Sequence, residues 1–192
     1  MMSESPSISI ALHKPGYVEI LSYFFQGLII SVPLTFFLET AAKNFTVQAL
    51  GSYYGVVVLT TIAAPLIEEF TKAFPLLHRH AETPRSIVAL GFFSGLGFGV
   101  AEFIVYVFFG APLLVRFPEL LFHAANTSIL AYGITKHRVL EFYALAVVLH
   151  FINNLFALTG DIWFIGGVAV IILTYILAWN YFVIAPNDFL NS

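Results

Sequence analysis

Five ionisable side chains lie inside long apolar stretches of the chain, and side chains of these types could carry out hydrolysis. Glu68 and Glu69 follow the run V-V-V-L-T-T-I-A-A-P-L-I, Glu102 follows G-L-G-F-G-V-A, and His123 and His150 have similar surroundings. A charged side chain at the centre of a bilayer costs roughly 2.5–3.5 kcal/mol on insertion scales, so residues of this kind are candidates for function. A carboxylate can remove a proton from water, and an imidazole can stabilise the oxyanion that follows.

The two glutamates also have a purely structural explanation, because a lysine follows them. Lys72 lies four residues after Glu68 and three after Glu69, so the three side chains share one face of a helix. An ion pair near a helix end would need no further role. The apolar residues A-F-P-L-L come after the lysine, however, and keep the carboxylates within the apolar segment. This stretch alone supports function and structure about equally.

Glu102 extends a glycine face of the segment that contains it. Gly91, Gly95 and Gly99 repeat at four-residue spacing, which predicts a smooth helix face that another helix can approach closely. Glu102 comes three residues after Gly99 and continues this face. We therefore expect its carboxylate to point into the interior of a helix bundle and away from lipid. The glycines by themselves indicate only packing.

The two histidines are each followed by polar side chains one helical turn further on. The sets are His123 with Asn126 and Thr127, and His150 with Asn153 and Asn154. A single histidine on an apolar helix is more often a satisfied core residue than a catalyst. Two of them in adjacent apolar segments, each with amides or hydroxyls on the same face, favour a shared polar site.

The elements that must position these side chains are membrane helices. The chain has 192 residues, of which 59% are hydrophobic and 10% charged, whereas a soluble domain carries about 25% charged residues. Segments long enough to span a bilayer lie at about 17–39, 52–76, 86–109, 117–135, 139–159 and 162–184. The sequence therefore predicts an all-α, polytopic membrane helix bundle of about six transmembrane helices, forming a single integral membrane domain over residues 1–192. The predicted surroundings are a lipid bilayer, with no nucleic-acid partner.

The basic residues predict how the bundle is oriented in the membrane. One side would carry Lys14, Lys72, Arg79, Arg85, Lys136 and Arg138, and the other Lys43, in the first connection, and Arg116. Basic residues are usually more frequent on the cytoplasmic side of a membrane protein, and here one side has six of them and the other has two. This difference predicts that both termini lie in the cytoplasm. We therefore expect a multi-pass protein of the cell membrane. The remaining acidic residues near predicted helix ends, Glu39 and Glu119 among them, are expected to be solvated.

Four motifs, in order along residues 62–158, resemble those of the PrsW-type intramembrane proteases. They are Glu68-Glu69-Phe-Thr-Lys72, Phe98 followed by Glu102, Arg116 followed by His123, and His150 followed by Asn154. This family is grouped with the CAAX-prenyl endopeptidases, which have His in place of the second motif's Glu, and with the bacteriocin-processing CPBP proteins. One departure is Phe103, where the family usually has Asn.

The resemblance implies a glutamate-dependent proteolytic site inside the bilayer. Glu68 would be the general base that activates water, and Glu69 would support it. Glu102 would take the place of the water-orienting histidine of the CAAX enzymes. Further catalytic positions implied by the motifs are His123, His150 and Asn154, which would complete the water site and stabilise the oxyanion. Lys72 and Arg116 are assigned to structure or charge balance.

The predicted substrate is a membrane-anchored or membrane-proximal protein or peptide. No cofactor is favoured, because the chain has no H-E-x-x-H pair. The alternative is zinc, since the family has been described as metal-dependent, and its ligands would then be Glu68, Glu102, His123 and His150. Two other functions stay open: CAAX-type processing of C-terminal lipidated peptides by the same fold, and a non-enzymatic membrane scaffold.

Overall fold

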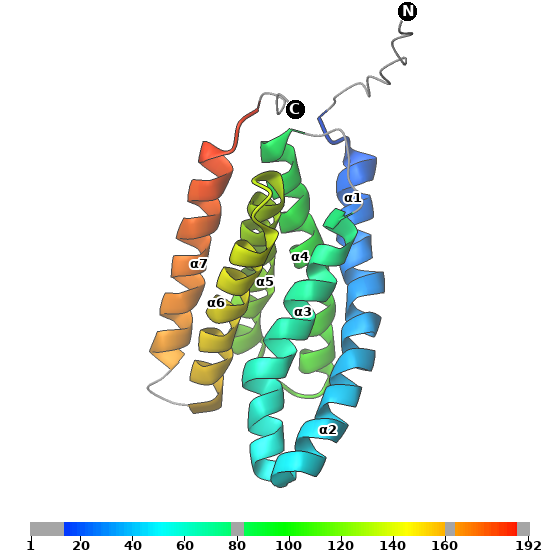
Figure 1. Ribbon diagram of the computed structural model, residues 1–192, viewed down its shortest axis with the longest axis vertical. Helices are drawn as coiled ribbons and strands as arrows, with labels where there is room; N and C mark the ends of the chain where they lie inside the picture. Colours follow the sequence, from blue (N-terminus) through cyan, green and yellow to red (C-terminus); the bar gives the residue numbers. More distant parts are fainter. Residues whose placement is uncertain (1–13, 78–82, 160–163, 188–192) are drawn as a thin grey trace, which may run out of the picture.

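The computed structural model describes residues 14–77, 83–159 and 164–187, and within these ranges all regular secondary structure is helical. The helices form an elongated bundle (Figure 1). Their bounds are α1 (Tyr17–Gln26), η1 (Gly27–Ser31), α2 (Val32–Val58), η2 (Leu59–Ala63), α3 (Ala64–Ala73), η3 (Phe74–Leu77), α4 (Pro84–Phe108), α5 (Leu113–Thr135), α6 (Val139–Thr159) and α7 (Phe164–Ile184). The predicted all-α fold class is confirmed.

The first helical stretch, from α1 to η3, is a hairpin that reverses direction inside α2 (Figure 1). The reversal lies at Gly51, whose φ of +79° is readily adopted by glycine and strained for other residues. Gly55 on the second arm packs against the backbone of Val47 on the first. The predicted connection around Lys43 is wrong, because no glycine or proline follows Glu39 until Gly51 and the helix continues through both residues.

Each arm of this hairpin has a proline just after a π-helical turn. Pro33 lies two residues after the end of η1, and Pro65 lies two residues after the end of η2. Proline has no N–H to donate, so the widened turn before it leaves a backbone carbonyl free for a partner on another helix. The extra residue in η2 also changes the direction in which the next residues of α3 face, and Glu68 and Glu69 are among these.

α4 and α5 pack more extensively against each other than any other pair of helices. Another helix approaches the glycine face of α4 closely, as predicted, and the structure identifies it as α5. A Cβ added at Gly95 would lie 2.3 Å from the backbone oxygen of His123 and 2.6 Å from Thr127 Oγ1. The absence of a side chain at Gly95 therefore lets α4 lie directly against the helix that carries His123.

Four helical stretches of the described chain are long and apolar enough to cross a membrane: Tyr17–Leu77, Pro84–Phe108, Val139–Thr159 and Ile165–Ile184. The chain is therefore an integral membrane protein. α5 is not among the four, although it has 23 residues, because its inner part is rich in polar and small side chains. These side chains are buried in the middle of the bundle. A count of six spans is not confirmed by length and composition, and it stays a prediction.

The two ends of the described chain lie at the same end of the bundle (Figure 1). Arg85, at the start of α4, ties this end together by donating hydrogen bonds to the carbonyls of Val183 and Ala185. Arg138 pairs there with Glu141. Arg79, which contributed to the predicted orientation, lies outside the described residues.

Candidate active site

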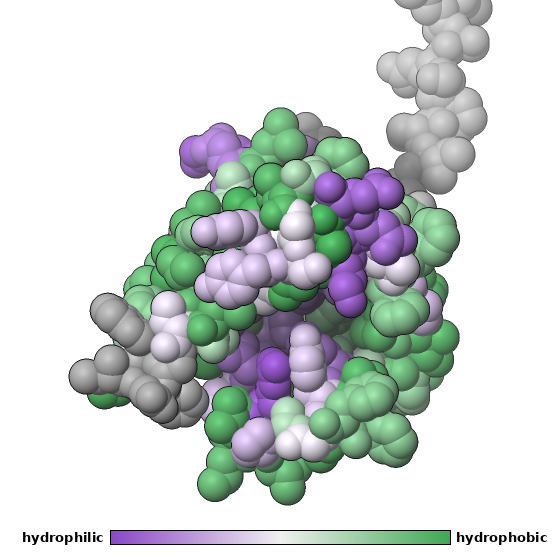
Figure 2. All heavy atoms as spheres, turned by 90° about the horizontal axis from the view of Figure 1, so that it is seen from below, coloured by the Kyte–Doolittle hydropathy of each residue, from purple (hydrophilic) through white to green (hydrophobic). Residues whose placement is uncertain are grey.

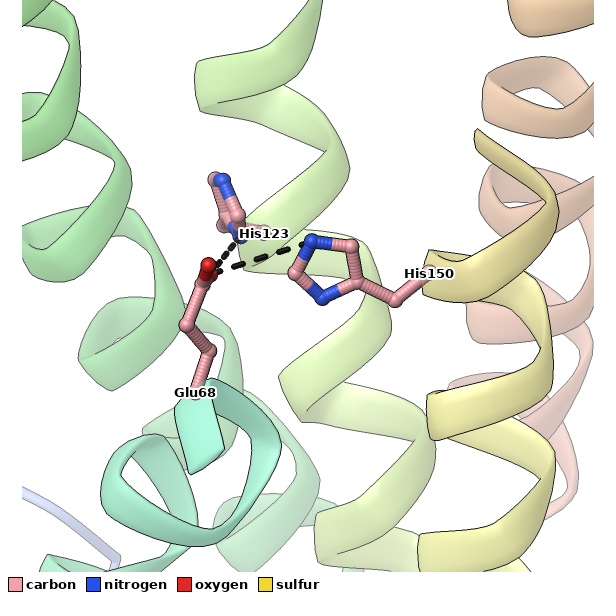
Figure 3. Close-up of side chains that lie close together, drawn as sticks. All are labelled: Glu68, His123 and His150. Atoms are coloured by element: carbon pink, nitrogen blue, oxygen red, sulfur yellow. Dashed lines mark ion pairs between the residues drawn. The ribbon is translucent and has the colours of Figure 1, made fainter. Parts of the chain in front are cut away.

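Glu68 on α3 lies between two imidazoles that come from different helices. Its Oε2 is 3.8 Å from Nδ1 of His123 on α5 and 3.8 Å from Nε2 of His150 on α6. Figure 3 shows the carboxylate pointing towards both rings. Glu68 is buried, and Oε2 has no hydrogen-bond partner among the described residues. A buried carboxylate oxygen without a donor is costly unless a water, a cation or a substrate group meets it.

Glu69 holds His150 from the other side of that imidazole. Glu69 Oε1 lies 2.7 Å from His150 Nδ1, and the Glu69 side chain is fully buried. Because Nδ1 bonds this carboxylate, the second ring nitrogen, Nε2, is left to face Glu68. Glu69 therefore orients an imidazole here, while its support of catalysis stays a prediction.

Glu102 holds His123 in the same way. Glu102 Oε2 lies 2.5 Å from His123 Nε2, so Nδ1 of that ring faces the centre of the cluster. The Glu102 side chain is 21% exposed, against 7% for Glu68 and none for Glu69. Its predicted orientation into the bundle is confirmed. Each imidazole is thus braced by one carboxylate and presents its other nitrogen to Glu68.

Lys72 lies at the centre of this cluster, and its side chain is fully buried. Its Nζ donates to Glu69 Oε1 at 2.6 Å and lies 2.9 Å from His123 Nδ1 and 3.8 Å from Glu68 Oε2. The lysine therefore compensates buried negative charge, in agreement with its predicted role. It also contacts a histidine from another helix, which spacing along α3 could not reveal.

A cavity of about 740 Å³ contains the site, and its lining includes Glu68, Glu102, His123, His150 and Asn154. Its other lining residues include those in the last turns of α4 and α6 and the first turns of α5, at the bundle end opposite the chain termini. Seen from that end, the surface is hollowed and hydrophilic residues lie inside the hollow (Figure 2). The structure thus brings these five predicted residues to one cavity, while Glu69 lies behind them.

Asn154 has a structural contact in addition to its place on the cavity. Its Nδ2 donates to the carbonyl of Thr60 in η2 at 3.0 Å. In the i to i+5 pairing of a π turn, that carbonyl would pair with residue 65, which is a proline without an N–H. Asn154 therefore replaces a hydrogen bond that Pro65 cannot make, and one of its two amide hydrogens is already used.

Two acidic residues that were expected to be solvated lie on the cavity instead. Glu39 lines it with a buried Oε1 that has no partner in the described part of the chain, and its carboxyl is within hydrogen-bonding reach of that of Glu68. Glu119 also lines it and accepts a 2.7 Å hydrogen bond from Asn153. The prediction was wrong because both flanking helices are longer than expected, so neither residue is at a helix end.

Glu68, His123 and His150 also fit a metal ion. One ligand atom from each lies within 4.8 Å of the others, and Glu68 Oε2 lacks a partner. The nitrogens that do not face Glu68 both bond carboxylates, an arrangement that metal-binding histidines commonly show. Glu102 is not in this group, since it bonds His123 on the outer side of the ring. A metal would displace Lys72 Nζ from His123 Nδ1.

Apolar helices around a buried cluster of carboxylates and imidazoles define an integral membrane protein with an ionisable centre inside the bundle. A family model described as the PrsW family intramembrane metalloprotease matches residues 18–182, and the chain belongs to this family. No curated protein and no solved structure matches the chain. The resemblance predicted from the four motifs is thereby confirmed for the PrsW family, while the wider link to CAAX-prenyl endopeptidases and CPBP proteins stays a prediction.

Proposed function

We propose that this chain is an intramembrane endopeptidase that cleaves a membrane-anchored or membrane-proximal protein. The observation that carries the proposal is the surroundings of Glu68. A buried carboxylate oxygen without a partner faces two imidazoles, each braced by a further carboxylate, on the wall of a cavity of about 740 Å³. Family membership supports the same activity.

In the metal-dependent form of this function, Glu68, His123 and His150 would hold a zinc ion. The ion would supply a Lewis acid for the scissile carbonyl and a water of lowered pKa. Glu69 and Glu102 keep the two imidazoles in the orientation that ligation needs. Glu102, the most exposed of the three acidic residues in the cluster, is best placed to take a proton from cavity water and return it to the leaving amine.

The position of Lys72 supports a second, metal-free form. Its ammonium lies 2.9 Å from His123 Nδ1 and 3.8 Å from Glu68 Oε2, beside the atoms that would ligate a metal. In this form Glu68 removes a proton from water and the hydroxide attacks the carbonyl carbon, while His123 and His150, which line the cavity beside Glu68, stabilise the oxyanion. Lys72 compensates the buried negative charge around them. Glu68 then gives the proton to the amine nitrogen as the peptide bond breaks.

The test compares purified wild type with Glu68→Gln on a panel of single-span test substrates in liposomes. Loss of the Glu68 carboxylate should reduce cleavage by about 100- to 10,000-fold, the contribution expected of a general base or a ligand at the reacting centre. Glu141→Gln is the control, because that carboxylate is exposed and pairs only with Arg138 among the described contacts. Equal behaviour of wild type and Glu68→Gln on every substrate would instead support the scaffold function.

We also propose six spans with both termini in the cytoplasm, which places the open end of the cavity on the other side of the membrane. Both ends of the described chain lie at the same end of the bundle, and basic residues such as Arg85 lie near them. These two features support the orientation. Because the chain has no cysteine, single-cysteine variants can report it. An impermeant maleimide applied to intact cells should label Lys43→Cys and leave Lys136→Cys unlabelled. The reverse pattern would invert the orientation.

A further inference from the structure

We infer that a side pocket of the cavity is a substrate subsite that accepts a lysine or arginine side chain. The inference rests on the proposed protease function and adds the class of side chain that the site selects. The pocket has a volume of about 360 Å³ and lies between α5, α6 and α7. It shares Arg116, Glu119 and Ala157 with the main cavity, so a peptide in the main cavity can extend a side chain into it.

Glu119 and Asn153 form the polar part of this side pocket. Asn153 Nδ2 donates to Glu119 Oε2, which leaves Asn153 Oδ1 without a partner among the described residues. Asn153 is only 1% exposed, so the missing partner matters energetically. No described basic side chain is ion-paired with Glu119. An occupant that supplies hydrogen-bond donors and positive charge would satisfy both acceptors.

The remaining wall of the side pocket is apolar and includes Val115, Phe156, Val168 and Ile171. Lysine and arginine combine a long apolar stem with hydrogen-bond donors and a positive charge. Such a side chain can contact the apolar wall and also the two acceptors, of which Glu119 lies where the two spaces meet and Asn153 lines the side pocket alone. Trypsin likewise uses a carboxylate in its specificity pocket to select these two side chains. An acidic substrate side chain would meet two acceptors and is therefore disfavoured.

Arg116 stands between the two spaces and faces the main cavity. Its guanidinium carbon lies 3.6 Å from the centre of the Tyr106 ring, and Tyr106 lines the main cavity but not the side pocket. The cation–π contact holds this charge at the entrance. Among the described residues Arg116 makes no salt bridge with Glu119, whose carboxylate accepts its hydrogen bond from Asn153.

Binding can be tested without any cleavage, using n-butylammonium as the probe and n-butyrate and n-butanol as matched compounds. Thermal unfolding in detergent is followed as each compound is titrated. We expect n-butylammonium to raise the Tm of wild type, and its apparent Kd to weaken about tenfold or more in Glu119→Gln. Glu39→Gln, which removes another carboxylate of the main cavity, and Glu68→Gln should bind as wild type does. Equal effects of n-butylammonium and n-butyrate would overturn the inference.

A steric variant keeps the test decisive if Glu119→Gln fails to fold. Gly167 on α7 lines the side pocket, and a Cβ there would lie 3.8 Å from Asn153 Oδ1, an ordinary contact. Gly167→Ala should therefore bind the probe, whereas the longer side chain of Gly167→Leu should fill the pocket and abolish the Tm shift. A Gly167→Leu protein that still responds like wild type would overturn the subsite.

Cleavage then separates this inference from the proposed function. Substrates that differ only by Lys, Leu or Glu near the scissile bond should be ranked with Lys first by kcat/KM. Glu119→Gln should reduce the Lys-to-Leu ratio about tenfold or more. If the protein cleaves its substrates but Glu119→Gln leaves the Lys-to-Leu ratio unchanged, the subsite is refuted and the protease function stands. If no substrate is cleaved but n-butylammonium still binds in a way that depends on Glu119, the protease function is refuted. The preference of the pocket for basic groups is then supported.

Discussion

Glu69 Oε1 lies 2.7 Å from His150 Nδ1, and this contact directs Nε2 of the same imidazole towards Glu68. A residue next to Glu68 in the sequence therefore acts on Glu68 through a histidine 81 positions away. Because a carboxylate that holds a histidine in this way raises its basicity and fixes its tautomer, the pair should matter for both metal binding and catalysis.

Glu69→Gln should lower zinc affinity or activity by about 10- to 100-fold, the range seen when such a supporting carboxylate is lost. The amide keeps the shape of the side chain but removes the charge that Lys72 and His150 share. Zinc titration and cleavage assays measure the two effects. Glu141→Gln, on the exposed surface, is the control. A Glu69→Gln protein with wild-type values in both assays would contradict the orienting role.

Removal of metal separates the two forms of the proposed mechanism. If zinc is held by Glu68, His123 and His150, the purified protein should contain about one zinc per chain by elemental analysis. A chelator should abolish cleavage, and added zinc should restore it. Glu68→Gln should lose most of its bound zinc. Full activity of a zinc-free protein would instead support Glu68 as the general base.

Glu39→Gln should make the protein more stable. The Glu39 carboxyl lies within hydrogen-bonding reach of the Glu68 carboxyl, and both have a buried oxygen without a partner among the described residues. A glutamine at position 39 removes one of two buried carboxyls that lie close together, and with it their mutual repulsion. We expect a gain of about 1 kcal/mol in the free energy of unfolding, or about 2–4 °C in Tm. A lower Tm would mean that a bound cation normally bridges the two carboxyls.

Gly95→Val should destabilise the bundle. The added Cβ would lie 2.3 Å from the backbone oxygen of His123, and a backbone atom in a packed helix cannot move aside cheaply. We expect a loss of about 1–3 kcal/mol or more in the free energy of unfolding. Gly167→Ala is the matched control, since its Cβ would meet nothing closer than 3.8 Å. Similar stability of the two variants would show that α4 and α5 are not so closely packed.

Asn154 and Pro65 should be coupled in a double-mutant cycle. Asn154→Ala leaves the Thr60 carbonyl without its donor and should cost about 1–3 kcal/mol of stability. Pro65→Ala restores a backbone N–H that can pair with the same carbonyl, so the second change should recover part of the loss. Chemical denaturation of the four proteins gives the coupling energy, expected to exceed about 0.5 kcal/mol. If the effects of Asn154→Ala and Pro65→Ala on the free energy of unfolding simply add, Asn154 does not replace the backbone hydrogen bond that Pro65 cannot make.

The sequence predicted the parts of the site that depend on a single helix. The apolar surroundings identified Glu68, His123 and His150, and the glycine spacing correctly placed Glu102 inside the bundle. It did not predict which carboxylate would brace which imidazole, because spacing along one helix says nothing about the rotation of its neighbour. The bonds from Glu69 to His150 and from Glu102 to His123 both cross between helices.

The errors came from where helices begin and end. Glu39 and Glu119 were placed near helix ends because polar neighbours suggested a loop around Lys43 and a later start for α5. Apolar periodicity locates the middle of a membrane helix well, but its ends depend on where the backbone can turn. Here that point is Gly51, whose positive φ terminates the first arm twelve residues beyond Glu39.

α5 is too polar to partition into lipid unaided, because Asn126, Thr127 and His123 would each meet hydrocarbon before any partner is present. We therefore expect α5 to become stable in the bilayer only when other helices cover it, above all α4 with its glycine face. The helix that supplies His123 would then depend on its neighbours for its place in the membrane. The reactive cluster would in that case form only after the surrounding helices have packed together.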